Sequence, residues 1–280
     1  MKFGDYECSS VELGSFAIDG GATFGVVPKV LWEKKIPADE KNLIPMKARS
    51  LLIQGKGKNI LVDTGPGNKL SEKLIKIYNL IKGSTDIDVS LSKHGLDCGD
   101  ITDVIITHLH FDHIGGSTFI KDGIIAPTFP NATYYLQKDQ FEAALNPGVR
   151  DVSSYMEENF MPLKEAGVLR LVEGPQELFC GIEIIVTMGH TSGQQHPLIK
   201  GEKNSLFFCA DLIPTSAHLP VTWHMAYDNY PLILMEEKER LLSRALMENW
   251  VLFFQHDQNV AAATVRQKNN NVMIDHAVLI

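Results

Sequence analysis

Three histidines and one aspartate lie within six consecutive positions, directly after an apolar run. The segment reads His108-Leu-His110-Phe-Asp112-His113. Alternate side chains of an extended chain share a face, so the first two histidines can reach one cation together, while the next turn presents the aspartate and the third histidine to a second cation. Imidazole nitrogens and carboxylate oxygens are ligands for Zn²⁺, Mn²⁺ and Fe²⁺. The spacing therefore predicts half of a two-metal site, with a polar loop of coincidental histidines as the alternative.

Three further residues of ligand type stand elsewhere in the chain, each after an apolar run. His190 is flanked by glycines that let the backbone turn sharply, while Asp211 and His256 follow runs rich in branched and aromatic side chains. Each alone has an ordinary interpretation, as a turn cap, a turn carboxylate or a core histidine. Two metals need more than four ligands, and these three residues supply the rest.

The ordered pattern HxHxDH, then GHTxG, then an aspartate and a final histidine, resembles the metallo-β-lactamase superfamily of dinuclear hydrolases. The resemblance covers residues 50–256. It implies an αββα sandwich, the metallo-β-lactamase fold, in which two packed mixed β-sheets are flanked by helices. It also implies seven metal ligands in two sets with one shared bridge: His108, His110 and His190; Asp112, His113 and His256; and Asp211 as the bridge. Asp112 and Asp211 are also its expected catalytic residues.

An earlier segment, NILVDTG at residues 59–65, also matches the family's pattern. By this resemblance Asp63 would stand behind a ligand imidazole and orient it through its other nitrogen. A carboxylate that merely forms the turn before Thr-Gly is the alternative.

The charge of such a site indicates its chemistry. Two divalent cations carry four positive charges, and two aspartates with a bridging hydroxide remove three, which leaves about one positive charge to attract a carbonyl or phosphoryl oxygen. Bound cations lower the pKa of water to about 7. We therefore expect hydrolysis by a metal-bridging hydroxide, with zinc as the expected metal and manganese or iron as alternatives. A structural, non-catalytic metalloprotein is the alternative of a different class, but seven ligands for two ions leave positions open for water.

Within the superfamily, the pattern is similar to acyl-homoserine-lactone lactonases and methyl parathion hydrolase. We expect a small-molecule ester as substrate, most of all a lactone, with phosphotriesters or thioesters as alternatives. The segment 19–32 resembles the one that precedes the first hairpin in those enzymes, and Phe24 and Trp32 in it could line an apolar mouth or pack in the core.

One position departs from the lactonase pattern. Pro214 stands where those lactonases have a tyrosine that can donate a hydrogen bond to the substrate. Another donor would be needed, and the candidates in the following segment are His218, His224, Tyr227 and Tyr230.

The elements that must position these residues are visible as short apolar runs. Runs rich in β-branched residues predict strands at 50–54, 59–63, 103–107, 133–136, 168–172, 182–187, 205–209 and 251–255. Helical periodicity predicts helices over Lys69–Ile81 and Pro231–Asn249, and the polar GKGK between the first two runs predicts a hairpin. Residues 141–167 could form helical excursions over the site, with a helix pair packed on the surface as the alternative. We expect one domain over residues 1–280.

Composition excludes several classes of partner. The chain has 26 basic and 34 acidic residues, a net charge of −8 that disfavours nucleic acid. No apolar run is long enough for a membrane span, and the N-terminus has no signal-peptide pattern, so we expect a cytoplasmic protein that does not bind membranes. The four cysteines have no CxxC spacing and are expected to be reduced thiols. A homodimer is possible.

Overall fold

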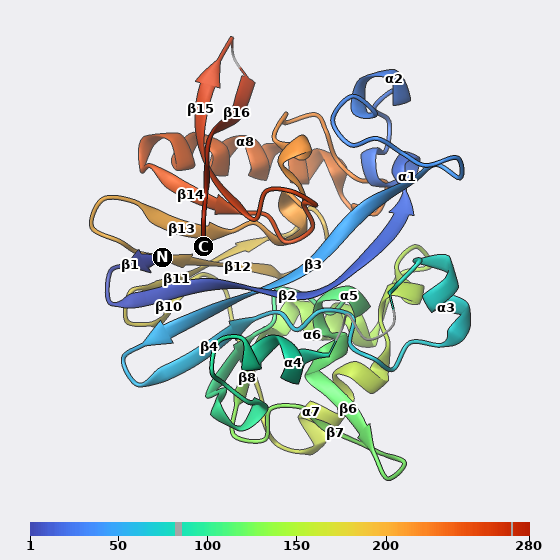
Figure 1. The fold of residues 1–280 in the computed structure, drawn as a ribbon, viewed down its shortest axis with the longest axis vertical. Helices are drawn as coiled ribbons and strands as arrows, with labels where there is room; N and C mark the ends of the chain where they lie inside the picture. The colour runs from blue at the N-terminus through green and yellow to red at the C-terminus, as the bar shows by residue number, and fades with distance from the viewer. Residues whose placement is uncertain (82–85, 270) are drawn as a thin grey trace.

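Two seven-stranded sheets face each other in the computed structural model, which describes residues 1–81, 86–269 and 271–280 (Figure 1). The first sheet contains, in spatial order, β1 (Lys2–Phe3), β2 (Tyr6–Asp19), β3 (Leu43–Gly55), β4 (Lys58–Val62), β5 (Asp103–Ile105), β8 (Thr133–Gln137) and β9 (Leu169–Val172). The second contains β10 (Gln176–Phe179), β11 (Ile182–Thr187), β12 (Gln194–Ile199), β13 (Ser205–Phe208), β14 (Trp250–Phe253), β15 (Ala262–Lys268) and β16 (Asn271–Val278). Strands β6 (Thr118–Lys121) and β7 (Ile124–Pro127) form a separate hairpin.

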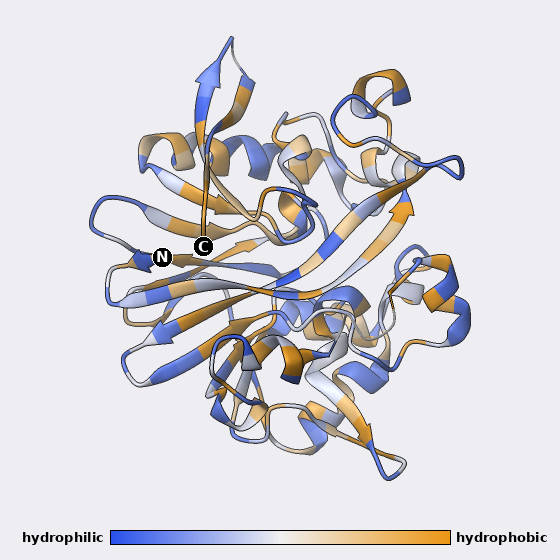
Figure 2. Ribbon diagram, in the orientation of Figure 1, coloured by the Kyte–Doolittle hydropathy of each residue, from blue (hydrophilic) through white to orange (hydrophobic). Residues whose placement is uncertain are grey.

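Helices cover the outer faces of both sheets (Figure 1). Helix α8 (Pro231–Met247) packs on the second sheet, and its ribbon carries both apolar and polar residues (Figure 2). The remaining helices are α1 (Gly20–Phe24), α2 (Lys29–Trp32), α3 (Glu72–Ile77), α4 (Ile87–Ser92), α5 (Phe111–Ile114), α6 (Lys138–Leu145) and α7 (Met161–Glu165).

Neighbouring residues of one strand belong to different apolar layers. Leu51 of β3 lies in the layer between the sheets, while Leu52 packs in the layer under the helices of the first sheet. In the second sheet Phe208 faces inward and Phe207 packs toward α8. This alternation follows from the two-residue period of a strand and gives both faces of each sheet a partner. The observed layers are those of an αββα sandwich, which confirms the predicted fold.

All eight predicted strands are present, with small differences at their ends, except that β3 begins at Leu43, well before the predicted start. The long strand β2 was not predicted. Its residues alternate between buried and partly exposed positions, and Glu7 and Glu12 interrupt the apolar pattern. The strand forms because it pairs with β3 along most of its length, a long-range contact that no local run reveals.

The two predicted helices have different outcomes. Helix α8 spans Pro231–Met247, in agreement with the prediction, and begins at a proline in its first turn. Helix α3 spans only Glu72–Ile77, much less than the predicted 69–81. Ser71 accepts a hydrogen bond from the backbone of Leu74 and caps the helix, and Asn79 has a φ of 45°, which ends it.

Residues 141–167 contain helical segments, the end of α6 and the whole of α7. The cysteines, all within the described residues, are free thiols, as predicted. Among the helices of the described residues, none combines the length and apolar character needed to cross a bilayer.

Candidate metal centre

The candidate ligands lie at one edge of the sandwich, where several strands end. Strands β4 and β5 are parallel, and so are β13 and β14. Because parallel strands end at the same edge, Asp63 after β4 lies beside the segment after β5, and Asp211 after β13 lies beside His256 after β14. Ala210 has a φ of 43°, a left-handed conformation that costs a residue with a Cβ about 1 kcal/mol and turns the chain just before Asp211.

Four ligand-type side chains form a first group. The atoms that His108, His110, His190 and Asp211 offer all lie within 4.8 Å of one another. Nε2 of His190 is 3.1 Å from Nδ1 of His110 and 3.2 Å from Oδ2 of Asp211. Atoms at these separations can surround one cation, whose bonds to nitrogen and oxygen are about 2.0–2.2 Å long.

Asp112, His113 and His256 form a second group within the same distance limit. Nε2 of His256 lies 3.3 Å from Nε2 of His113 and 3.9 Å from Oδ2 of Asp112. Two ring nitrogens that face each other in this way can share at most one proton, so a cation between them satisfies both lone pairs.

Asp211 faces both groups with different oxygens. Its Oδ2 lies 3.2 Å from His190 and 3.9 Å from His108, while its Oδ1 lies 3.1 Å from His256 and 3.4 Å from His113. This is the arrangement that a carboxylate shared by two neighbouring cations requires. The structure thus brings all seven predicted ligands together in the predicted two sets, with Asp211 between them.

Some buried polar atoms at the centre have no hydrogen-bond partner, and this indicates whether the site fits cations. Nε2 of His108 and Oδ1 of Asp211 are buried and have no hydrogen-bond partner. Each such atom costs about 1–3 kcal/mol when it is left unsatisfied. Cations at the centre would remove part of this cost, and a set of imidazoles and carboxylates suits divalent zinc, manganese or iron. The residues present therefore fit two divalent ions.

Burial and neighbouring charges shift the pKa values of the candidate ligands in both directions. Burial, together with neighbouring imidazoles, holds the pKa values of His108 and His110 well below the ordinary histidine value. Burial acts to raise the pKa of Asp211, but three surrounding imidazoles outweigh it and hold that pKa well below its usual range. For His113 and His190 burial acts to lower the pKa, but nearby carboxylates outweigh it and raise both values. A bound cation would displace these protons.

Asp63 lies directly behind one candidate ligand. Its Oδ2 is 2.9 Å from Nδ1 of His113, and the carboxylate accepts hydrogen bonds from the backbone N–H of Thr107 at 2.7 Å and from its hydroxyl at 2.8 Å. Thr107 Oγ1 also lies 3.0 Å from Nδ1 of His108. A carboxylate at Nδ1 fixes the tautomer in which Nε2 of His113 offers its lone pair to the centre.

A second carboxylate of this kind, Asp228, was not singled out from the sequence. Its Oδ1 lies 2.7 Å from Nδ1 of His190, and its Oδ2 accepts a hydrogen bond from the backbone of Met225 at 2.7 Å. No spacing or motif marks it, because it stands far from His190 in the chain and in a segment without regular periodicity.

Helix α8 fixes the backbone that leads to His190. Both carboxylate oxygens of Glu237 accept backbone hydrogen bonds, from Met188 at 2.7 Å and from Gly189 at 3.0 Å. A Cβ at Gly189 would lie 2.4 Å from the Cα of Leu234, so only glycine lets the helix approach this closely.

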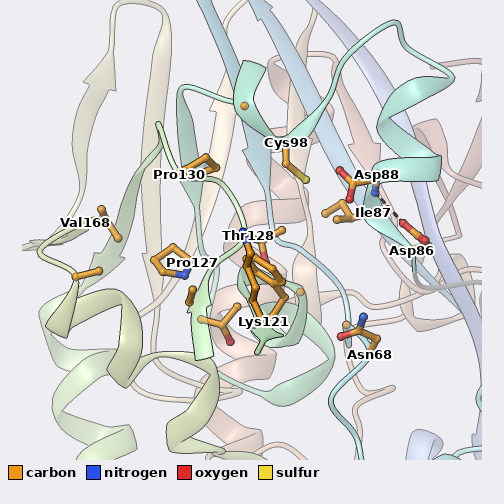
Figure 3. Close-up of a pocket in the computed structure, with 17 residues that line it drawn as sticks. Asn68, Asp86, Ile87, Asp88, Cys98, Lys121, Pro127, Thr128, Pro130 and Val168 are labelled. Atoms are coloured by element: carbon orange, nitrogen blue, oxygen red, sulfur yellow. Dashed lines mark hydrogen bonds between the residues drawn. The ribbon is translucent and has the colours of Figure 1, made fainter. Parts of the chain in front are cut away.

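A small pocket of about 80 Å³ opens onto the centre. Its lining combines candidate ligands with apolar and aromatic side chains: Phe16, Ile18, Met46, Tyr78, His110, Phe111, Asp112, Ser154, His190, Asp211, Met225, Tyr227 and His256. A larger cavity of about 770 Å³, bordered by Cys98, Thr128 and Lys121, lies elsewhere and contains none of the candidate ligands (Figure 3).

The predicted substrate-binding residues differ in whether they line this pocket. Only Tyr227 lines the pocket. The residue is 42% exposed, and partial burial of its phenol raises its pKa to about 12, so the phenol keeps its proton and can donate a hydrogen bond. Nδ1 of His224 lies 3.0 Å from the carbonyl oxygen of Met225, and the side chain of Tyr230 is half exposed. Neither lines the pocket.

The structure corrects the expectation for Phe24, Trp32 and His218. Their exposed fractions are 0%, 1% and 0%, and Phe24 stacks on the other two rings, with centroid distances of 5.2 Å to Trp32 and 4.5 Å to His218. Nε2 of His218 lies 2.9 Å from the carbonyl oxygen of Thr23. Phe24 and Trp32, the last residues of α1 and α2, point into the core, and His218, from the segment after β13, packs against Phe24.

The sequence of this chain is similar to those of known proteins over most of its length. A model of the metallo-beta-lactamase superfamily matches residues 44–256. An N-acyl homoserine lactonase of Bacillus cereus is 27% identical over 230 residues, which cover 77% of this chain and 83% of the relative.

Solved structures agree on the fold. A probable metal-dependent hydrolase from Staphylococcus aureus is 32% identical and superposes with a TM-score of 0.89 over 100% of both chains. A dizinc quorum-quenching lactonase, crystallised with a product, is 20% identical and has a TM-score of 0.80 over 100% of this chain and 97% of its own.

Proposed function

Because this chain belongs to the metallo-β-lactamase superfamily of metal-dependent hydrolases, we propose that it cleaves a small ester, most of all a lactone, at a two-metal centre. The observation that carries this proposal is the position of Asp211, which turns one oxygen toward each group of histidines. A site built to close around a single structural ion has no need of such a bridge. The lactonases among the relatives support the lactone as substrate.

When bound, two divalent ions lower the pKa of water to about 7 and polarise the oxygen of a bound carbonyl. His108, His110 and His190 would hold one ion, Asp112, His113 and His256 the other, and Asp211 both. Zinc is the expected metal, with manganese or iron as alternatives.

The side chains around the pocket would provide a hydrogen bond to the substrate, transfer a proton and select the charge of the substrate. Tyr227 lines the pocket, so its phenol would donate a hydrogen bond to the substrate oxygen, the role for which Pro214 leaves no tyrosine at the lactonase position. Of the two carboxylates among the seven ligands, Asp112 is the more exposed and lines the pocket, so it can take up the proton that the attacking water releases and pass it to the leaving alkoxide when the ring opens. Among the described lining residues there is no lysine or arginine, which favours a neutral substrate.

A panel of chromogenic substrates tests the proposal. Metal-loaded protein would be assayed with lactones, simple esters, thioesters and phosphotriesters, and Asp211→Ala would serve as the control. We expect lactones to have the highest kcat/KM and the variant to lose turnover. Higher turnover of phosphotriesters or thioesters would reassign the substrate class, and no turnover of any class would overturn the proposal.

A further inference from the structure

A buried arginine holds the backbone segment that carries His256. Arg49 of β3 is 4% exposed. Its Nη1 donates hydrogen bonds to two carbonyl oxygens, that of Phe254 at 3.4 Å and that of Asp257. Its Nη2 donates to the carbonyl oxygen of Gln258 at 3.5 Å. Its Nε donates to Glu12 at 2.6 Å. The guanidinium thus contacts three carbonyl groups within five residues, on both sides of His256.

These carbonyl groups lie beyond the last residue of β14, Phe253, where the ladder between strands no longer provides partners. A buried carbonyl that loses its donor costs about 1–3 kcal/mol. Without the guanidinium the segment would therefore move to find other donors, and its side chains would move with it. A planar group with several fixed N–H donors suits this task better than a lysine ammonium.

His256 is held in place by the same strand. Its Nδ1 lies 2.8 Å from the carbonyl oxygen of Lys47, and its own carbonyl accepts a hydrogen bond from the backbone N–H of Lys47 at 3.1 Å. Nδ1 is thus occupied as a donor, and Nε2 is left for the centre. Arg49 follows two residues later on β3 and contacts the flanking backbone, so the strand fixes both the tautomer and the position of His256.

We propose that Arg49 is a positioning residue for the second group, Asp112, His113 and His256, and that the first group does not depend on it. This inference rests on the proposed two-metal function. Glu237 is its counterpart for the first group, since its carboxylate holds the backbone just before His190. The two groups are therefore fixed from different elements, β3 and α8, and each can be weakened separately.

A titration of metal-free protein with Zn²⁺ against a competing chelator tests this. For Arg49→Ala we expect one equivalent to bind with wild-type affinity and the other to bind about 10 to 100 times more weakly, the usual effect of losing a group that supports a ligand. Arg49→Lys should give an intermediate loss of affinity for that ion, and it tests the same contacts if the alanine variant does not fold. Glu12→Gln removes the ion pairs of Glu12 with Arg49 and Lys47 but leaves the three carbonyl contacts of Arg49, and this variant should bind both equivalents as the wild type does.

A double-mutant cycle identifies the site that is affected. In a His256→Ala background, Arg49→Lys should cause no further loss of affinity for the remaining ion, while Glu237→Gln should weaken it. Equal weakening of both ions by Arg49→Lys, two unchanged equivalents in Arg49→Ala, or a wild type that binds fewer than two ions would overturn the inference. Two bound ions without turnover of any substrate would instead contradict the proposed function alone.

Discussion

The carboxylate of Asp228 lies 2.7 Å from Nδ1 of His190, and its exposed fraction is only 1%. Asp63 has the same relationship to His113. Each group of candidate ligands therefore contains one histidine whose outer nitrogen faces a buried carboxylate. Such carboxylates fix the tautomer of the ring and raise the basicity of the ligating nitrogen.

Asp228→Asn should weaken the ion held by the first group. The amide can still accept a hydrogen bond from Nδ1, but it removes the negative charge, so we expect a loss of about tenfold in Zn²⁺ affinity. Titration against a chelator measures this, and Asp151→Asn, at a carboxylate that contacts Asn229 and not His190, provides a matched control. Unchanged affinity in Asp228→Asn would show that the contact does not support the ligand.

Tyr227→Phe should lower kcat/KM for a lactone by about 100 to 1000 times, as expected when a single hydrogen-bond donor to a developing oxyanion is lost. The effect should appear mainly in kcat, because the charge on the substrate oxygen develops in the transition state. Tyr230→Phe, outside the pocket, should keep wild-type kinetics. If the two variants behave alike, Tyr227 is not the donor.

The resemblance to the superfamily predicted the two groups of ligands, and strand geometry explains why they meet. His108 and His110 are two positions apart, and Asp211 and His256 follow apolar runs that become the neighbouring parallel strands β13 and β14. The apolar runs predicted the strands of the sandwich, since buried strands produce continuous apolar runs.

The residues behind the ligands could not be predicted in this way. Asp228, Glu237 and Arg49 act through contacts with backbone or side chains that lie 38, 48 and more than 200 positions away along the chain. No local pattern encodes such contacts. The apolar rings of Phe24 and Trp32 were equally ambiguous, because a core and a pocket mouth both select aromatic residues.

Phe24→Ala should destabilise the protein without changing substrate recognition. The ring is fully buried and stacks on Trp32, so its removal should lower the free energy of unfolding by about 3–5 kcal/mol. Urea unfolding measures the loss, and KM for the best substrate should stay within about twofold of the wild type. A large rise in KM with little loss of stability would indicate that Phe24 contacts the substrate.

His218 should make the stability of the protein depend on pH. Burial lowers its pKa to about 3, while the unfolded chain keeps the ordinary value of 6.5. Between these values the unfolded state binds a proton that the native state does not, so stability rises with pH across this window and is lost as the pH falls from 6.5 toward 3. At pH 5 the loss due to this residue should be about 2 kcal/mol.

Urea unfolding of metal-loaded wild type and His218→Gln at pH 7.5 and pH 5 measures this loss, and the free energy of unfolding of the variant should fall by about 2 kcal/mol less than that of the wild type. Parallel pH profiles for the two proteins would mean that His218 can take up a proton in the native core, with its bond to Thr23 and its stack on Phe24 rearranged to accommodate the charge.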